Sequence, residues 1–270
     1  MIRIAHSPDA DDAFMFYPLA KSKIEIDLKF EHVLGDIQTL NQKALAGEYE
    51  VSAISLHAYP YIAGKYALLS CGGSVGCGYG PVVVSRKRIR GLRGKTVAVP
   101  GLLTTAYLTL KLFEKGFTAK VIPFDKIIDE VVNGGTDAGV VIHEGQIFYR
   151  DEKLYKLADL GEWWYGKTRL PLPLGGIAVR RDLGEELMKK IAHCIGESIK
   201  YALEHREEAL DYALKFARGL EKNKADKFIG MYVNKYTLDY GEDGRKAIKL
   251  LLSRGYEEGI ITKKVKVDFV

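Results

Sequence analysis

The sequence predicts an α/β fold with two lobes and a ligand cleft between them. Short apolar runs rich in β-branched residues alternate with helix-like segments, which is typical of sheets covered by helices. At 270 residues, the chain is longer than an ordinary single domain. Glycine-rich residues 71–80 and proline- and glycine-rich residues 170–176 mark two places where we expect the chain to cross between lobes.

Composition narrows the function classes. The net charge is only +5, and basic and acidic residues are interleaved, so we expect no nucleic-acid partner but mild attraction for a small anion. No apolar stretch approaches membrane-spanning length, and the first residues lack a secretory leader, so we expect a cytoplasmic protein with no membrane partner. Cys71, Cys77 and Cys194 show no zinc-type spacing, and we expect reduced thiols.

The first quarter of the chain begins with two strand-and-helix pairs. Residues 2–5 form a predicted strand, a polar loop follows, and residues 13–20 form a helix for which Asp11 and Asp12 suit the N-cap and first turn. Residues 24–33 alternate apolar and polar, the period of a half-exposed strand. Asp36 can cap a helix that stops at Gly47.

The next strand and the glycine-rich segment also lead to polar groups. Residues 51–57 form a predicted strand that ends in Ser55, Leu56 and His57, and residues 59–62 form a short helical or irregular cover. Five glycines occupy residues 71–80 without the spacing of a phosphate-binding loop, so we expect backbone that closely approaches a ligand. Residues 81–85 form a strand, and the basic run 86–90 is interpreted as a solvated turn.

Residues 96–149 have a βαβαβα pattern, which favours a parallel sheet. Thr104 and Thr105 stand at the start of a predicted helix, 106–115, where hydroxyls and free amides suit a ligand carboxylate or hydroxyl; a plain helix cap is an equally good interpretation. The last strand of this series runs through Ile142 to His143.

His143 is the candidate for proton transfer. An apolar run that ends in His143 indicates a buried strand with the imidazole at its carboxyl end, where open α/β folds place ligands. Histidine titrates nearest neutral pH and suits a general base. A lone histidine at a strand end is more often a satisfied core residue, so this pattern alone leaves the structural role favoured.

The remaining sequence predicts a short strand, an aromatic loop and a helical C-terminal part. Residues 154–158 form the strand, and residues 161–166, with both tryptophans, form a loop that we interpret as core cover rather than a ligand-stacking surface. Helical spacing extends from residue 183, with a break at 204–208 and further helices near 222–235 and 242–254.

These elements predict a discontinuous first lobe, 1–85 and 175–270, with a second lobe, 86–174, inserted in it. Residues 81–85 and 176–180 would be hinge strands. This arrangement resembles the type II periplasmic-binding-protein fold, whose loops at the carboxyl ends of strands face the cleft.

Four segments in order carry a more specific resemblance. Residues 5–15 (AHSPDADDAFM), 51–55 (VSAIS), 101–106 (GLLTTA) and 142–146 (IHEGQ) resemble the 1,4-dihydroxy-6-naphthoate synthase family of the futalosine route to menaquinone. The likeness extends over the whole chain. The sister chorismate dehydratase is a more distant resemblance, and the His-Glu-Gly segment favours the synthase.

The resemblance implies a lyase that converts cyclic dehypoxanthine futalosine to 1,4-dihydroxy-6-naphthoate without an organic cofactor or metal. It implies that His143 is the general base. Asp9 and Asp12 lie in the first motif without an assigned role. The implied substrate-binding residues are Ser55, Leu56, His57, Thr104, Thr105 and Ile142.

Two other functions stay open at this point. A solute receptor or sensor on the same fold would bind a ligand without turnover, and the sister dehydratase would act on a different substrate. His6 and His57, with Asp9, Asp11 and Asp12, imitate a metal cluster, but capping and site-lining roles are the better interpretation. The sequence does not predict the oligomeric state.

Overall fold

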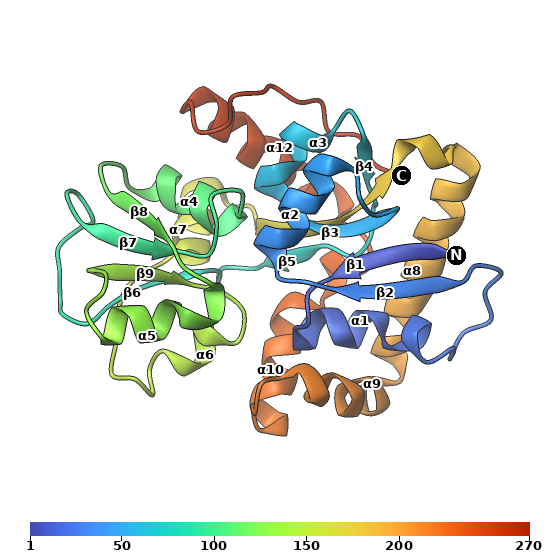
Figure 1. Ribbon diagram of the computed structural model, residues 1–270, viewed down its shortest axis with the longest axis horizontal. Helices are drawn as coiled ribbons and strands as arrows, with labels where there is room; N and C mark the ends of the chain where they lie inside the picture. Colours follow the sequence, from blue (N-terminus) through green and yellow to red (C-terminus); the bar gives the residue numbers. More distant parts are fainter.

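Alternating strands and helices build two sheets, which lie side by side in Figure 1. The computed structural model describes all residues, 1–270. Each sheet has helices on both faces, and we refer to each sheet with its helices as a lobe. The predicted α/β class with two lobes is therefore confirmed.

The first lobe contains a six-stranded sheet in the order β2-β1-β3-β11-β4, with β5 also paired to β11. β1 runs parallel to β2 and β3, whereas β11 runs antiparallel to β3, β4 and β5. The strands are β1 Ile2–His6, β2 Phe30–Leu34, β3 Val51–Ser55, β4 Tyr66–Leu68, β5 Ser74–Gly76 and β11 Leu172–Arg180.

Helices bury apolar clusters on both faces of this sheet. α1, α8, α9 and α10 pack on one face, and α2, α3 and α12 cover the other (Figure 1). In α8, Met188, Ile191, Ile195 and Ile199 share one buried stripe, as their spacing predicts. The helices are α1 Ala10–Ala20, α2 Ile37–Ala46, α3 Tyr59–Ile62, α8 Glu185–Glu204, α9 Arg206–Ala213, α10 Lys222–Tyr232, α11 Lys235–Leu238 and α12 Gly241–Glu257.

The second lobe contains a five-stranded sheet in the order β10-β6-β9-β7-β8. β7, β8 and β9 are parallel, as the βαβαβα pattern predicts, whereas β6 is antiparallel to β9 and β10. The strands are β6 Val82–Ser85, β7 Thr96–Val99, β8 Thr118–Val121, β9 Ala138–Val141 and β10 Tyr155–Asp159, and the helices are α4 Thr105–Phe113, α5 Ile127–Val132, α6 Gly145–Phe148 and α7 Leu160–Thr168.

The strand β6 corrects one boundary of the predicted lobes. Val82–Ser85 was expected to end the first lobe as a hinge strand, but it pairs with β9 and β10 inside the second sheet. Its valines are all buried, and they pack on both faces of that sheet, which explains the pairing. The crossing therefore lies before Val82. The predicted boundary at residues 174 and 175 falls inside β11, because Leu172 and Pro173 already pair with β5 in the first-lobe sheet.

Two further expectations about local structure were wrong. Residues 24–29 are not in a strand; Ile24, Ile26 and Leu28 instead pack as loop residues on the first-lobe core. Residues 161–166 lie in α7, not in a loop, because Asp159 caps that helix by accepting hydrogen bonds from Gly161 N and Glu162 N. The expected core role is confirmed for Trp164, which is fully buried.

The two lobes also contact each other through apolar groups. Leu108 of α4 and Trp164 of α7 belong to the same buried cluster as Tyr240 and Leu251 of the first lobe. Gly255 of α12 permits this approach, since a Cβ there would lie 3.0 Å from Leu108 Cδ1 and 2.6 Å from Ile261 Cδ1. The lobes therefore meet through packed side chains.

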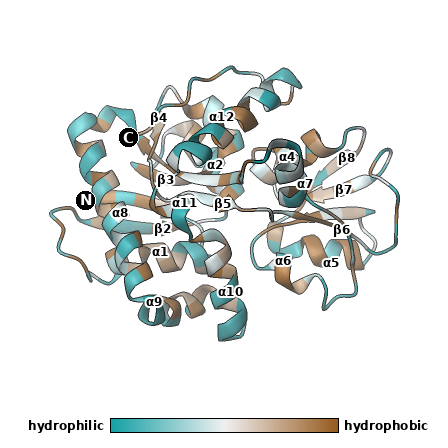
Figure 2. Ribbon diagram, turned by 180° about the vertical axis from the view of Figure 1, so that it is seen from behind, coloured by the Kyte–Doolittle hydropathy of each residue, from teal (hydrophilic) through white to brown (hydrophobic).

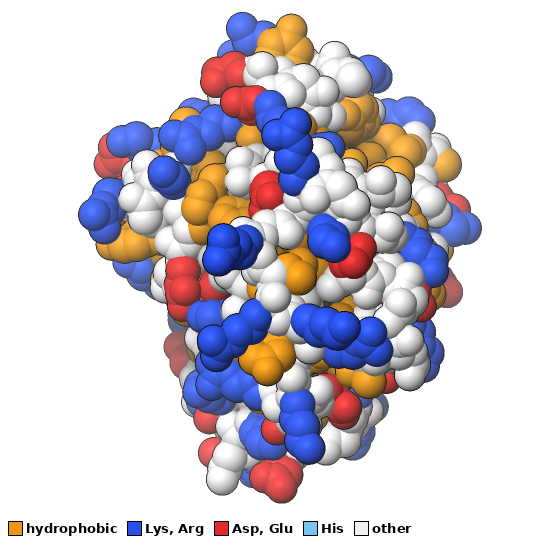
Figure 3. Space-filling view, turned by 90° about the vertical axis from the view of Figure 1, so that its left-hand side faces the viewer, with side chains coloured by type: hydrophobic (Ala, Val, Ile, Leu, Met, Phe, Trp, Pro, Cys, Tyr) orange, Lys and Arg blue, Asp and Glu red, His pale blue; other side chains and the backbone are white.

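Hydrophobic side chains gather in the interior and charged side chains on the surface. Figure 2 shows hydrophobic residues along the strands of both sheets, while α8 and α9 carry many hydrophilic residues. Many basic side chains cover the face in Figure 3, and Arg86, Lys87 and Arg88 are exposed, as expected for a solvated turn. The three cysteines are free thiols. No helix has both the length and the apolarity needed to cross a membrane.

Candidate active site

A cavity lies between the lobes and contains about 740 Å³ of space not filled by protein, part of it open to solvent. The loops after β1, β7 and β9 and the carboxyl end of β3 all reach it. Its polar lining comprises Ser7, Asp9, Asp11, Asp12, Ser55, Ser74, Thr104, Thr105, His143, Gln146 and Tyr232.

His143 lies in this cavity, directly after β9 and Ile142, which also lines it. Its backbone has φ +53°, a left-handed conformation that few residues other than glycine adopt. Nδ1 lies 3.0 Å from Asp9 Oδ2, and the side chain is 18% exposed. Nε2 is covered and has no hydrogen-bond partner. The imidazole is thus fixed through one nitrogen, while the other is uncommitted.

Asp9 is fully buried and is in close polar contact with three side chains. Besides His143, Ser7 Oγ donates to Asp9 Oδ2, and Arg218 donates to Oδ1 at 2.9 Å. Asp9 is the N-cap residue of α1, but its side chain makes no capping bond. The carboxylate is therefore directed toward the cavity and away from the helix N-terminus.

Further buried carboxyl groups lie in or beside this end of the cavity, and burial and mutual repulsion raise their pKa values. Burial raises the pKa of Asp12 to about 7, with a further contribution from the Asp9 charge. Burial also raises the pKa of Asp11 well above its usual range, and the charges of Asp12 and Asp9 add to this. The pKa of Glu144 rises for the same reasons, burial first and Asp9 second. An anionic ligand group is disfavoured here.

The opposite end of the cavity offers hydroxyls and the N-terminus of α4. Asn41 holds Ser55, accepting from Ser55 N at 2.8 Å and donating to Ser55 Oγ at 3.1 Å. Thr104 caps α4 by accepting from Tyr107 N, so the plain-cap interpretation is correct for Thr104, which nevertheless also lines the cavity. Thr105 Oγ1 donates to Leu174 O at 2.5 Å. The first N–H groups of α4 have no intrahelical acceptor, which favours an anion at this end.

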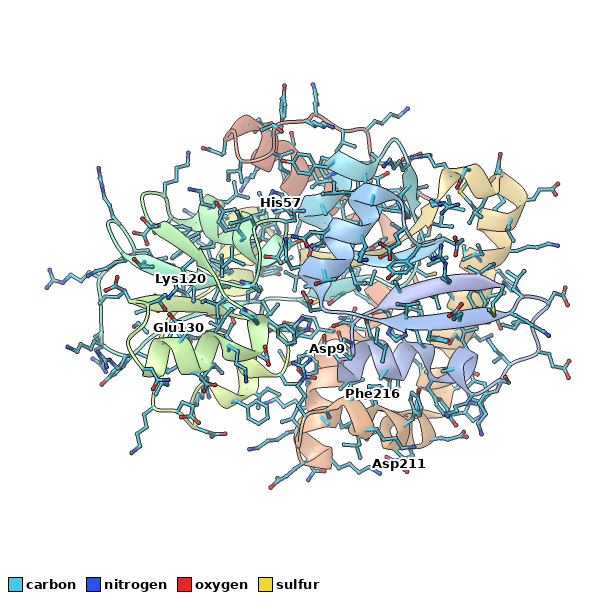
Figure 4. The ribbon with its side chains drawn as sticks, viewed as in Figure 1. Asp9, His57, Lys120, Glu130, Asp211 and Phe216 are labelled. Atoms are coloured by element: carbon cyan, nitrogen blue, oxygen red, sulfur yellow. The ribbon has the colours of Figure 1, made fainter.

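Leu56 and His57 do not line this cavity, contrary to their predicted contact with substrate. The chain turns into a short 3-10 helix after Ser55, and this turn buries Leu56 in the apolar cluster that both lobes share. His57 lines a separate groove with Tyr61 and Tyr107, and its Nδ1 lies 3.2 Å from Thr104 O. Burial lowers the pKa of His57 to about 4. Figure 4 shows His57 and Asp9 well apart at the junction of the lobes.

The histidine and aspartate residues that imitate a metal cluster in the sequence separate in the structure. His6 Nε2 lies 3.0 Å from His32 Nδ1, outside the cavity lining. Asp9, Asp11 and His143 do come together, with one ligand atom from each within 4.8 Å of the others. These three residues could hold a cation, but Arg218 already neutralises the Asp9 charge.

Several residues of the site were not found by sequence reasoning. Asp9 ends the polar loop after β1, and Asp12 lies in the first turn of α1. A polar loop at this point is a signal for a site, but no role for either residue follows from it. No local sequence pattern marks Arg218 as a site residue, because its partner Asp9 lies 209 positions away in the sequence. Tyr232 of α10 and Gln146 of α6 are also brought together only by the fold, with Tyr232 donating to Gln146 Oε1 at 2.7 Å.

Comparisons with known proteins agree with this architecture. A family model described as menaquinone biosynthesis matches residues 2–257. The 1,4-dihydroxy-6-naphthoate synthase of Thermus thermophilus is 39% identical over 269 residues, which cover 100% of this chain and 99% of the relative.

Two solved structures support the fold. A crystal structure of a protein from Archaeoglobus fulgidus has a TM-score of 0.94 and 49% identity, covering 96% of this chain and 98% of that one. The alkanesulfonate-binding protein of Xanthomonas axonopodis pv. citri has a TM-score of 0.72 at 13% identity, covering 100% of this chain and 98% of that one. The second likeness concerns the fold alone, and it confirms the predicted periplasmic-binding-protein-like class.

Proposed function

This chain belongs to the menaquinone biosynthesis family that includes the 1,4-dihydroxy-6-naphthoate synthases, and from that premise we propose that it converts cyclic dehypoxanthine futalosine to 1,4-dihydroxy-6-naphthoate. In this proposal it is a cytoplasmic carbon–carbon lyase, and His143 is its general base. The observation that carries the proposal is His143 itself. It lies in the cavity between the lobes, with Nδ1 3.0 Å from Asp9 Oδ2 and Nε2 uncommitted.

A general base needs a lone pair that other protein groups do not occupy. Nε2 of His143 meets this condition because no protein group bonds to it. The lobes cover Nε2, so substrate entry requires some opening before the cleft encloses it. Proton transfer by a positioned base contributes about 10²–10⁴-fold to rate, and orientation in an enclosed cleft adds to this.

The uneven charge of the cavity supports one orientation of the substrate. Its aromatic carboxylate would meet the N-terminus of α4, beside Ser55 and Thr105, where the backbone N–H groups favour a negative charge. Its sugar-derived hydroxyls would lie toward Asp9 and His143, which accept hydrogen bonds from neutral groups. The reverse orientation would bring a carboxylate against buried acids and is disfavoured.

The test is a product assay by mass spectrometry with the full chain. Wild type should form 1,4-dihydroxy-6-naphthoate, and His143→Asn should lower turnover by about 10²–10⁴-fold while thermal unfolding stays cooperative. His193→Asn, on the exposed surface of α8, is the matched control and should retain full activity. Normal turnover by His143→Asn would exclude His143 as the base.

The same assay separates the other functions. Chorismate is run in parallel, and its dehydration by wild type would point to the sister reaction. Binding of either substrate without turnover would point to a receptor or sensor. Either outcome would contradict the proposed synthase activity.

A further inference from the structure

We infer that Asp9 is the positioning residue for His143, and that closure of the two lobes assembles this pair. The inference rests on the proposed role of His143 as base, and it adds the group that orients it. Asp9 follows β1 of the first lobe, whereas His143 follows β9 of the second lobe. Neither lobe alone contains both residues.

The contact with Asp9 determines which nitrogen of His143 can accept a proton. Asp9 Oδ2 lies 3.0 Å from Nδ1, and the carboxylate is fully buried. An acceptor oxygen this close to Nδ1 favours the tautomer with the ring hydrogen on Nδ1, which leaves the lone pair on Nε2. Nε2 is the nitrogen without a protein partner. Asp9 therefore selects the tautomer that a base needs.

Other contacts prevent the Asp9 carboxylate from turning away. Arg218 donates to Oδ1 at 2.9 Å, and Ser7 Oγ donates to Oδ2. The Arg218 guanidinium also lies over the ring of Phe124, with its carbon 4.4 Å from the ring centroid. Phe124 in turn meets the imidazole of His143 edge-on, with centroids 4.9 Å apart.

These four residues form a closed cycle of contacts, Asp9 to His143 to Phe124 to Arg218 and back to Asp9. Asp9 and Arg218 belong to the first lobe, and His143 and Phe124 to the second. Two contacts of the cycle cross the cleft, so separation of the lobes breaks both. The oriented base then exists only when the cleft is closed around its substrate.

The backbone of His143 supports this inference. Its left-handed φ of +53° is unfavourable for a residue with a side chain and needs contacts that hold it. The Asp9 bond is a contact that both orients the ring and opposes relaxation of the loop. A histidine that merely fills a strand end needs no such constraint.

The test is Asp9→Asn in the full chain, which keeps the shape of the side chain and removes its charge. We expect kcat to fall by about 10²-fold or more with KM changed less than about threefold, because a misoriented imidazole affects the reaction rather than ground-state binding. Side-chain ¹⁵N NMR gives a second measurement. Wild-type His143 should show a single tautomer with hydrogen on Nδ1, and Asp9→Asn should show a mixture.

Two further variants distinguish positioning from general weakening of the lobe contact. Glu258→Gln removes an ion pair with Lys115 that also spans the lobes but lies away from the cavity, and it should change neither kcat nor the tautomer. Arg218→Met should lower kcat and mix the His143 tautomers as Asp9→Asn does, but to a smaller extent. This variant serves as the test if Asp9→Asn does not fold.

The outcomes separate this inference from the proposed function. The inference is overturned if His143→Asn is inactive but Asp9→Asn keeps both kcat and the tautomer of wild type. It is also overturned if Glu258→Gln reproduces the Asp9→Asn kinetics. Full activity of His143→Asn would instead refute the proposed base, whatever Asp9→Asn shows.

Discussion

Tyr232 of the first lobe donates a hydrogen bond to Gln146 of the second lobe, with the hydroxyl 2.7 Å from Gln146 Oε1 at the wall of the cavity. Both partners lie on helices, α10 and α6, that begin far apart in the sequence. This bond therefore connects the lobes next to the candidate active site, and it should contribute to cleft closure.

Removal of that hydroxyl should weaken substrate binding more than turnover. We expect Tyr232→Phe to raise KM about 3- to 10-fold, because a hydrogen bond is worth about 1 kcal/mol. Steady-state kinetics measure this, and a cycle with Gln146→Leu is the control. The double variant should raise KM no more than the more damaging single variant does. Strictly additive effects on KM would show that the two residues act separately.

Asp12 should make stability fall as pH rises. Its pKa is raised to about 7, so between about pH 4 and 7 the folded protein holds more protons than the unfolded chain. Asp12→Asn removes the ionisable group and with it the free-energy cost of ionising a buried carboxyl. In the wild-type structure Ser7 N donates to Asp12 Oδ2 at 2.7 Å, and the asparagine oxygen can still accept this bond. We expect the variant to exceed wild type in unfolding free energy by roughly 1–3 kcal/mol at pH 8, and to match it near pH 4.

Chemical denaturation at several pH values measures this difference. Asp182 is the control, because its hydrogen bond to Arg180 lowers its pKa, so Asp182→Asn should not gain stability at high pH. A constant offset between Asp12→Asn and wild type across the whole range would contradict the predicted linkage.

Thr105 should matter for both binding and stability. Its hydroxyl donates to Leu174 O and accepts from His57 N, and it lines the end of the cavity proposed for the carboxylate. Thr105→Val leaves both partners without their bond, so we expect about 1–3 kcal/mol of lost stability and a higher KM. Thr105→Ser keeps the hydroxyl and should retain most of the wild-type stability and a KM close to that of wild type. Equal behaviour of the valine and serine variants would show that the hydroxyl is dispensable.

Chelation should leave turnover unchanged. Asp9, Asp11 and His143 have suitable ligand atoms, but Asp9 is already committed to Arg218 and His143. A cation would have to displace these bonds. Activity after EDTA treatment and elemental analysis of the purified protein measure this. One equivalent of metal in wild type that is lost in His143→Asn would show that the three residues bind a cation.

The sequence by itself determined most of the secondary structure and the position of the candidate base, His143, directly after a buried strand. Apolar β-branched runs form β3, β7 and β9, because such side chains fill both faces of a buried sheet. Helical periodicity predicts α8 and the break before α9. Ser55, Thr104, Thr105 and His143 follow strands or begin a helix, so local pattern alone was enough to place them at one edge of the sheets.

Only the tertiary structure decided which residues meet across the lobes. Arg218 and Asp9 come together over 209 positions, and no local period encodes such a contact. A single turn after Ser55 directs Leu56 and His57 away from the cavity, although all three are adjacent in sequence. Periodicity reports which face of an element is buried, whereas the partner on that face depends on how whole elements pack. For this reason the sequence predicts the imidazole, and the fold supplies the carboxylate that orients it.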